Sequence, residues 1–262
     1  MARRNPWIPT QYGAWALLLL PIMTAYGRAI RLHDFSPFYL PATVAMISAY
    51  LAFNAYSVAI SMRPHRRSYA MRVVWIYSSL LIIAGLITAI MNPSILWWTI
   101  LAAPVVAVAL RSVQSRRERS ISSGISTLIL ASGTFIALRI GDPSVIFTSE
   151  RPAYLIQEIA LFIVIICYEI GTVFHVKSLI RERLSRRAAL RSAIYHLISF
   201  TIVTLCIFPS WLNDIFLAIF AFITIRAALL PILIRHHRLS VGLIGSIEMA
   251  ITITISIAAI AL

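Results

Sequence analysis

Nine long apolar runs, separated by short polar or basic stretches, constrain this chain more than any other feature of its sequence. A membrane-spanning α-helix needs about 20 mostly apolar residues, because each residue adds 1.5 Å across a hydrocarbon core about 30 Å thick. The nine runs are 12–30, 37–62, 71–91, 95–110, 121–140, 153–179, 192–208, 212–234 and 239–262. The fourth and seventh are shorter than the others. The sequence therefore predicts nine transmembrane helices.

Composition supports a membrane protein rather than a water-soluble one. Hydrophobic residues make up 60% of the 262 residues and charged residues only 12%, whereas soluble domains carry about 25% charged residues. The first run has no small-residue cleavage site after its apolar core, so we expect a resident helix rather than a removable signal. The predicted fold is all-α and polytopic, with one transmembrane domain over residues 1–262.

The basic residues predict the orientation. The net charge is +14, which in a soluble protein would suggest nucleic acid, but no polar stretch is long enough to form a basic domain, so no nucleic-acid partner is expected. Only Arg28, Arg31, Arg139 and Arg151 fall on one side of the expected spans. The other side carries Arg3, Arg4, Arg63, Arg66, Arg67, Arg72, Arg111, Arg116, Arg117, Arg119, Lys177, Arg181, Arg183, Arg186, Arg187, Arg191, Arg235 and Arg238. Because cationic loops stay in the cytoplasm, we predict a cytoplasmic N-terminus and an external C-terminus in the plasma membrane.

The stretch PTQYGAWALLLLP at residues 9–21 begins the first expected span. It resembles the opening of the YwiC-like family of membrane proteins, in which Gln-His-Gly-Ala-Trp precedes leucines and a proline. The matching residues are Gln11, Gly13, Ala14, Trp15 and Pro21. Tyr12 replaces the usual His, so a proton-transfer role of that His does not carry over. VKSLIRER at 176–183 and GLIGSIEMA at 242–250 resemble two further family signatures, and the resemblance implies a membrane protein without an established activity.

Nine spans in this orientation also resemble the architecture of UbiA-type intramembrane prenyltransferases. Those enzymes carry Asp-rich motifs at the cytoplasmic ends of the second and sixth spans. Here Asn54, Ser57 and Ser61 hold the three-then-four spacing of the first motif. Neutral amides and hydroxyls substitute poorly for carboxylates around Mg²⁺, so no metal or other cofactor is predicted. A ligand-binding face and a helix-packing face both remain open for this stripe.

The sixth expected span contains two carboxyl groups. Glu158 and Glu169 are three helical turns apart, about 16 Å along one face, and His175 lies close to the cytoplasmic end. An ionisable group inside a membrane usually pairs or lines a wet cavity. We predict a polar pocket of Glu169, His175 and the Asn54 stripe, with a paired structural glutamate as the alternative.

The last two spans contain one opposite charge each. Arg226 and Glu248 both lie about nine residues from the same end of adjacent spans. Equal depth and a short connection predict a structural ion pair, because burial of both charges together leaves neither unpaired. Gly242 and Gly245, near the start of the ninth span, are expected to allow a close helix approach.

The basic stretches next to the second and sixth spans are candidate contacts for anionic groups. Arg63, Lys177 and Arg181 stand at these ends, and each basic side chain near a membrane surface attracts anionic head groups by about 1 kcal/mol. Membrane topology alone would also produce such stretches.

These features predict a multi-pass membrane protein that holds an amphiphilic or anionic, lipid-like or prenyl-type ligand in a cytoplasm-facing cavity among membrane lipids. A divergent UbiA-like prenyl or lipid transferase without the Asp-rich motifs is one alternative, and a small-solute transporter is another. No nucleophile–base triad, phosphate-binding glycine loop or metal-ligand cluster stands out in the sequence. Whether the protein is an enzyme stays open.

Overall fold

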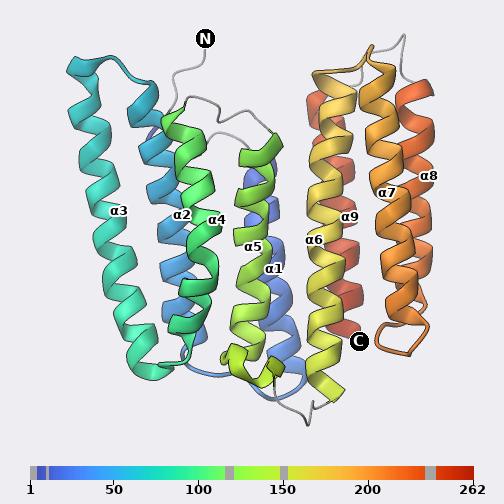
Figure 1. Ribbon diagram of the computed structural model, residues 1–262, viewed down its shortest axis with the longest axis horizontal. Coiled ribbons are helices and arrows are strands. Elements are labelled where there is room, and N and C mark those ends of the chain that lie inside the picture. Colours follow the sequence, from blue (N-terminus) through green and yellow to red (C-terminus); the bar gives the residue numbers. More distant parts are fainter. Residues whose placement is uncertain (1–4, 10–11, 116–120, 148–152, 234–239) are drawn as a thin grey trace. The chain divides into compact units, whose positions relative to one another are not determined.

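The computed structural model describes residues 5–9, 12–115, 121–147, 153–233 and 240–262. Every regular element within these ranges is helical (Figure 1), which confirms the all-α prediction. The elements are α1 (Tyr12–Arg31), α2 (Tyr39–Ser61), α3 (Pro64–Met91), α4 (Ile95–Gln114), α5 (Ile121–Ile140), the short 3-10 helix η1 (Pro143–Phe147), α6 (Ala153–Ile180), α7 (Arg186–Ile207), α8 (Ile215–Leu233) and α9 (Val241–Ala261).

Each predicted span corresponds to one α-helix, although several helices are longer than the apolar run that predicts them. α3 begins at Pro64 and α7 at Arg186, so both include basic residues that the sequence analysis assigned to connections. Arginine is a good helix former, and proline suits the first turn of a helix. The apolar run therefore predicts the part of a helix that lies in the hydrocarbon of the membrane, and the helix itself extends beyond that part.

The described helices have the lengths and surfaces of membrane spans. Eight of them, α2 to α9, are long and apolar enough to cross a membrane. α3 exposes large apolar side chains along its length, including Trp75, Ile82, Leu86 and Ile90. A water-soluble protein rarely exposes an apolar surface of this extent, whereas lipid solvates it. The protein is a polytopic α-helical membrane protein.

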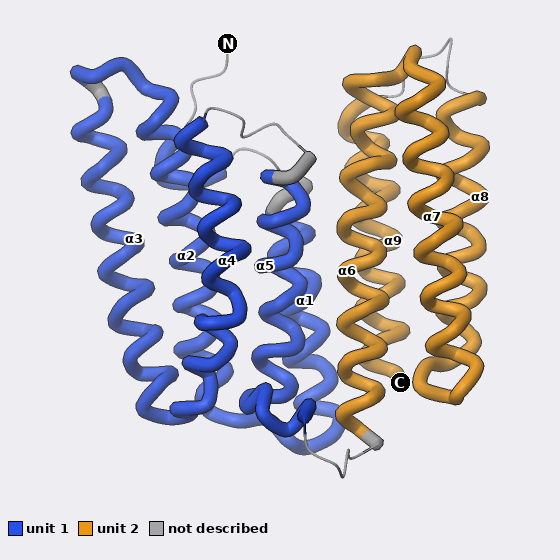
Figure 2. The backbone as a smooth tube through the Cα atoms, in the orientation of Figure 1, with its two compact units in different colours: residues 1–149 blue, residues 150–262 orange. Residues whose placement is uncertain are grey.

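The chain divides into two compact units, Met1–Ser149 and Glu150–Leu262 (Figure 2). In the first unit α2 packs along α3, and α5 contacts both α1 and α4. In the second unit α7 contacts α6 and α8, and α9 contacts the same two helices. The single transmembrane domain over residues 1–262 stays a prediction.

In the first unit, arginines that the sequence analysis assigned to opposite sides of the membrane lie at opposite ends of the helices. Successive helices within each unit run in opposite directions (Figure 1). In the first unit, one end carries Arg63, Arg67 and Arg111, and the other carries Arg28, Arg31 and Arg139. Which end faces the cytoplasm stays a prediction. Residues used for it or for the family pattern that lie outside the described ranges are Arg3, Arg4, Gln11, Arg116, Arg117, Arg119, Arg151, Arg235 and Arg238.

An ion pair fastens the α1–α2 connection to α5. Arg139 donates to both carboxylate oxygens of Asp34, at 2.8 and 2.9 Å, and to the Tyr39 hydroxyl at 3.3 Å. Two parallel bonds make this a strong, charge-assisted contact. The hydrogen bond from Arg139 is the main cause of a lowered pKa of Asp34. The sequence analysis used Arg139 only as a marker of orientation, and its structural partner became visible in the fold.

Candidate functional site

The predicted polar stripe on α2 has partners within its own unit. The Ser61 hydroxyl donates to the Val58 carbonyl at 2.8 Å. The Asn54 amide donates to the Pro6 carbonyl at 3.5 Å, the outer limit of a hydrogen bond. Ser57 is half-buried on the same helix, and Arg63 is exposed just before α3. These contacts use the stripe for packing of the helix and the N-terminal segment.

The segment at residues 5–9 is also tied to α3. The Trp7 indole donates to the Tyr69 hydroxyl at 2.7 Å, and the Tyr77 hydroxyl donates to the Trp7 carbonyl at 2.9 Å. The Trp7 and Tyr77 rings meet edge to face, with centroids 6.1 Å apart. The N-terminal segment therefore covers the Asn54 end of α2 and α3.

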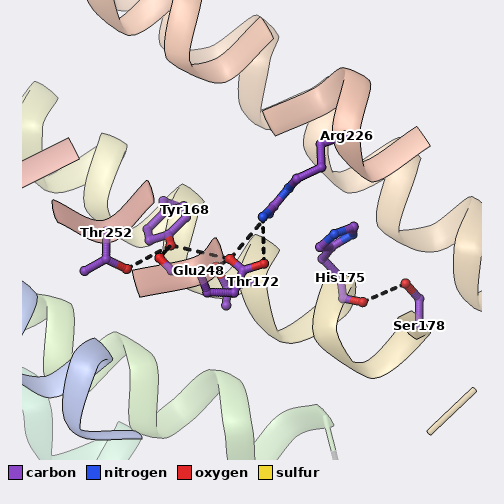
Figure 3. Close-up of polar contacts among 7 residues, drawn as sticks. All are labelled: Tyr168, Thr172, His175, Ser178, Arg226, Glu248 and Thr252. Carbon is purple, nitrogen blue, oxygen red and sulfur yellow. Dashed lines mark hydrogen bonds and ion pairs between the residues drawn. The ribbon is translucent and has the colours of Figure 1, made fainter. Parts of the chain in front are cut away.

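The second unit brings Arg226 and Glu248 together (Figure 3). The Arg226 Nη1 atom lies 2.8 Å from Glu248 Oε1, and Nη2 donates to Oε2 at 3.3 Å. The two side chains are only 8% and 11% exposed. Adjacent helices α8 and α9 supply the two charges at matching depth, which is the arrangement that the sequence predicted.

Two hydroxyl groups on α6 contact this carboxylate. Thr172 on α6 donates to Glu248 Oε2 at 3.3 Å, and the Tyr168 hydroxyl lies 3.5 Å from the same oxygen. Tyr168 also donates to the Glu248 backbone carbonyl at 2.9 Å and lies 2.9 Å from the Thr252 hydroxyl. Donors from α6 and α8 thus converge on α9, and the carboxylate is both charge-paired and hydrogen-bonded.

His175 is the exception within this polar core. Its side chain is fully buried, yet neither ring nitrogen has a hydrogen-bond partner among the described residues. The ring lies edge to face with that of His196 on α7, with centroids 5.9 Å apart, and within electrostatic range of Arg226. Figure 3 shows the ring beside the Arg226 side chain, while the His175 carbonyl accepts from Ser178.

His196 occupies a close contact between α6 and α7. Its Nδ1 atom lies 2.7 Å from the Ser192 carbonyl, which can only accept, so Nδ1 carries the proton. A Cβ atom on Gly171 would stand 2.9 Å from His196 Nε2. Among the described residues, a Cβ on Gly242 or Gly245 would meet nothing within 4 Å. The described residues thus contradict the expectation that those two glycines allow a close helix approach, whereas Gly171 stands in a close contact between helices.

Several buried polar atoms of this core have no hydrogen-bond partner among the described residues. Arg226 Nε has no hydrogen-bond partner among the described residues, and neither has either nitrogen of His175. Arg226 Nη1 and Glu248 Oε1 face each other in the ion pair, at an angle that does not make a hydrogen bond. A neutral imidazole offers one donor and one acceptor, and Nε of arginine offers a donor. Arg226 Nε and the His175 ring together thus leave two donors and one acceptor without partners among the described residues.

The remaining predicted residues of the second unit lie on α6 or just beyond it. Glu169 is fully buried. Glu182 pairs with Lys177 at 3.0 Å and with Arg191 at 2.6 Å, so one carboxylate bridges two basic groups at the surface. Arg181 is exposed at the end of α6. Lys177 is thus engaged in a surface ion pair, whereas Arg181 presents its charge to the surroundings.

The predicted ligand-binding residues are divided between the two units. Asn54, Ser57, Ser61 and Arg63 belong to the first, and Glu169, His175, Lys177 and Arg181 to the second. A pocket shared by the two sets stays a prediction. Among the described residues no group of three or more His, Cys, Asp or Glu could hold a metal ion.

The sequence analysis missed two members of the polar core, Tyr168 and His196. Tyr168, Thr172 and His175 follow one another at four and three residues, so their common helix face could have been recognised. His196 had no such signal, because its contact crosses from α7 to α6.

Comparison with known proteins gives a family and one named relative. The model of the YwiC-like protein family matches residues 8–138, which lie within the first unit. "Uncharacterized protein YwiC" of Bacillus subtilis (strain 168) is 27% identical over 195 residues, covering 73% of this chain and 74% of that protein. No solved structure matches the chain. The polar core of α6 to α9 lies beyond the residues that the family model matches.

Proposed function

The chain belongs to the YwiC-like protein family, and on that premise we propose that it binds an amphiphilic or anionic ligand in the polar core of α6 to α9. One observation carries the proposal: the fully buried His175 ring has no hydrogen-bond partner among the described residues and lies beside the Arg226–Glu248 pair. Ionisable groups inside membrane proteins commonly mark ligand or ion pathways.

Buried polar groups without hydrogen-bond partners destabilise the fold. Leaving a buried donor or acceptor unsatisfied costs about 1–3 kcal/mol for each group. A water molecule or a polar ligand removes this cost when it reaches the site. Two open donors, on Arg226 and His175, favour a ligand that presents acceptor oxygen atoms, as sulfonates, phosphates and carboxylates do.

The basic end of α6 supports the same class of ligand. Arg181 lies six residues beyond His175, about 9 Å along the helix axis. Exposed arginines there and at the start of α7 attract anions. An amphiphile could place its charged group between this end and the core while its chain stays in lipid.

Binding by the full chain in lipid nanodiscs tests the proposal. We choose three probes: octanesulfonate as an anionic amphiphile, octanol as its neutral counterpart, and methanesulfonate as the same anion without a chain. Octanesulfonate is expected to raise the unfolding temperature and octanol is not. A shift with methanesulfonate as well would identify a free anion as sufficient. His175→Leu, which fills the position without polar atoms, should abolish the shift. Equal shifts for octanesulfonate and octanol, or a shift that survives His175→Leu, would count against this function.

The proposed location is the plasma membrane, with the basic ends in the cytoplasm, as the arginine distribution supports. Single cysteines at Arg181 and Leu262, in a background with Cys167→Ser and Cys206→Ser, test the orientation. An impermeant thiol reagent added outside intact cells should label position 262 and leave position 181 unlabelled. The reverse pattern would refute it.

Transport is the second candidate, and Pro231 favours it. Pro231 lies inside α8, five residues after Arg226. Proline has no N–H group, so the carbonyl four residues earlier, at Ala227, loses its helical hydrogen bond. α8 stays helical over Ile215–Leu233, so the missing bond weakens the helix without breaking it, and transporters commonly place discontinuous helices next to their binding groups. Accumulation of labelled methanesulfonate in proteoliposomes would support transport, and binding without accumulation would exclude it for this anion. The prenyl-transferase alternative stays a prediction that native mass spectrometry with a prenyl diphosphate and Mg²⁺ can test.

A further inference from the structure

We infer that the anion bound in the α6–α9 core enters together with one proton, which His175 accepts. The inference rests on the proposed function and specifies the chemistry of that same site. It concerns a monoanionic group, whether free or at the end of an amphiphile.

Two opposite charges beside His175 balance each other. Arg226 from α8 and Glu248 from α9 face each other at 2.8 Å and sum to zero. From α7, His196 faces the His175 ring. On α6 itself, Tyr168 and Thr172 contribute hydroxyl groups that already contact Glu248. A monoanion that joins this set leaves one uncompensated negative charge in a buried place, which is strongly unfavourable.

The His175 side chain can supply the compensating positive charge. Histidine is the side chain whose charge ordinarily changes between pH 5 and 8. Both nitrogens of His175 are uncommitted among the described residues. As an imidazolium it donates from both, so one proton can bridge to the anion and its charge balances that of the ligand.

The neighbouring ionisable groups fit this role less well. His196 already uses Nδ1 for the Ser192 carbonyl, and its Nε2 stands against Gly171. Glu169 lies six residues before His175 on the same helix, which turns it about 120° away from His175 around the axis. Lys177 is paired with Glu182 at the surface. His175 is therefore the group to which we assign the proton.

The test counts protons. Octanesulfonate stays a monoanion from pH 6 to 8, so any pH dependence of its binding belongs to the protein. Isothermal titration of the full chain in nanodiscs, in two buffers of different ionisation enthalpy, should show about one proton taken up for each anion bound. Across this range the dissociation constant is then expected to fall up to tenfold for each unit by which the pH falls.

Variants assign the proton. His175→Asn keeps a polar group at the position and removes the titration, so binding should weaken and lose its pH dependence. His33→Asn is the matched control, because His33 is exposed on the α1–α2 connection, and it should behave as wild type. Proton uptake near zero in the wild type overturns the inference, as does uptake that persists in a folded His175→Asn variant. The number of protons that the wild type takes up for each bound anion tests the inference even if the His175→Asn variant does not fold. Absence of anion binding at every pH overturns the proposed function, and this inference with it.

Discussion

The buried Arg226–Glu248 pair allows a quantitative test of how the second unit is held together. Arg226→Met removes the positive charge and keeps most of the side-chain volume. Glu248 then remains buried with only hydroxyl donors from α6. Removing one partner of a buried ion pair costs about 3–5 kcal/mol, and each 1.4 kcal/mol is a factor of ten. The folded-to-unfolded ratio should fall by roughly two to three and a half orders of magnitude.

A second substitution distinguishes loss of the pair from loss of packing. Glu248→Gln alone leaves Arg226 buried without its anion and should also destabilise strongly. Combined with Arg226→Met, it removes the uncompensated charge and keeps an amide oxygen that can accept from Thr172. The double variant should therefore be at least about 2 kcal/mol more stable than the sum of the single losses predicts, which is the signature of direct coupling.

Unfolding by increasing mole fractions of sodium dodecyl sulfate, followed by circular dichroism, measures these differences. Arg191→Met is the matched control, because Arg191 also pairs with a glutamate but is half exposed. An exposed pair contributes about 0–1 kcal/mol. Strictly additive losses in the double variant, or single losses no larger than that of Arg191→Met, would refute the argument.

Two further predictions concern single positions. Gly171→Ala should lower stability by about 1–3 kcal/mol, because the new Cβ would stand 2.9 Å from His196 Nε2. At Gly85 a Cβ would meet nothing within 4 Å among the described residues, so Gly85→Ala should be neutral or stabilising in the same detergent titration. Equal losses of stability at Gly171 and Gly85 would contradict the close contact at Gly171. Asp34→Asn should remove part of the acid sensitivity of the first unit, because the pKa of Asp34 is lowered in the folded protein. The pairing of Asp34 with Arg139 stabilises the fold fully above the ordinary aspartate pKa of about 3.9. This stabilisation is lost as the pH falls through the lower pKa of the folded state. Thermal unfolding of the wild type and of Asp34→Asn, at pH 6 and in strongly acidic buffer, measures this loss of stability. If the unfolding temperatures of the two proteins depend on pH in the same way, the Asp34 carboxylate contributes nothing to the acid sensitivity.

Within the polar core, a contact could be predicted from the sequence only where its two residues lie on helices that follow each other in the chain. The Arg226–Glu248 pairing could be predicted because the two residues lie at matching depth on helices joined by a short connection. Tyr168 and Thr172 could be placed on one helix face, but the direction in which that face points could not be read from the amino-acid sequence. In lipid this direction is hard to infer, because apolar side chains are suitable both towards neighbouring helices and towards the membrane.

The sequence by itself determined that the protein lies in lipid, and it determined the number and approximate positions of the long helices among the described residues. Each of these follows from local composition, because about 20 apolar residues suffice to define a span. Only the tertiary structure decided that His175 is buried without a partner among the described residues, that Gly171 accommodates His196, and that Arg139 holds Asp34. These contacts depend on the rotation of each helix about its axis and on which helices are neighbours, and the free energy that sets both comes from side chains far apart in the chain.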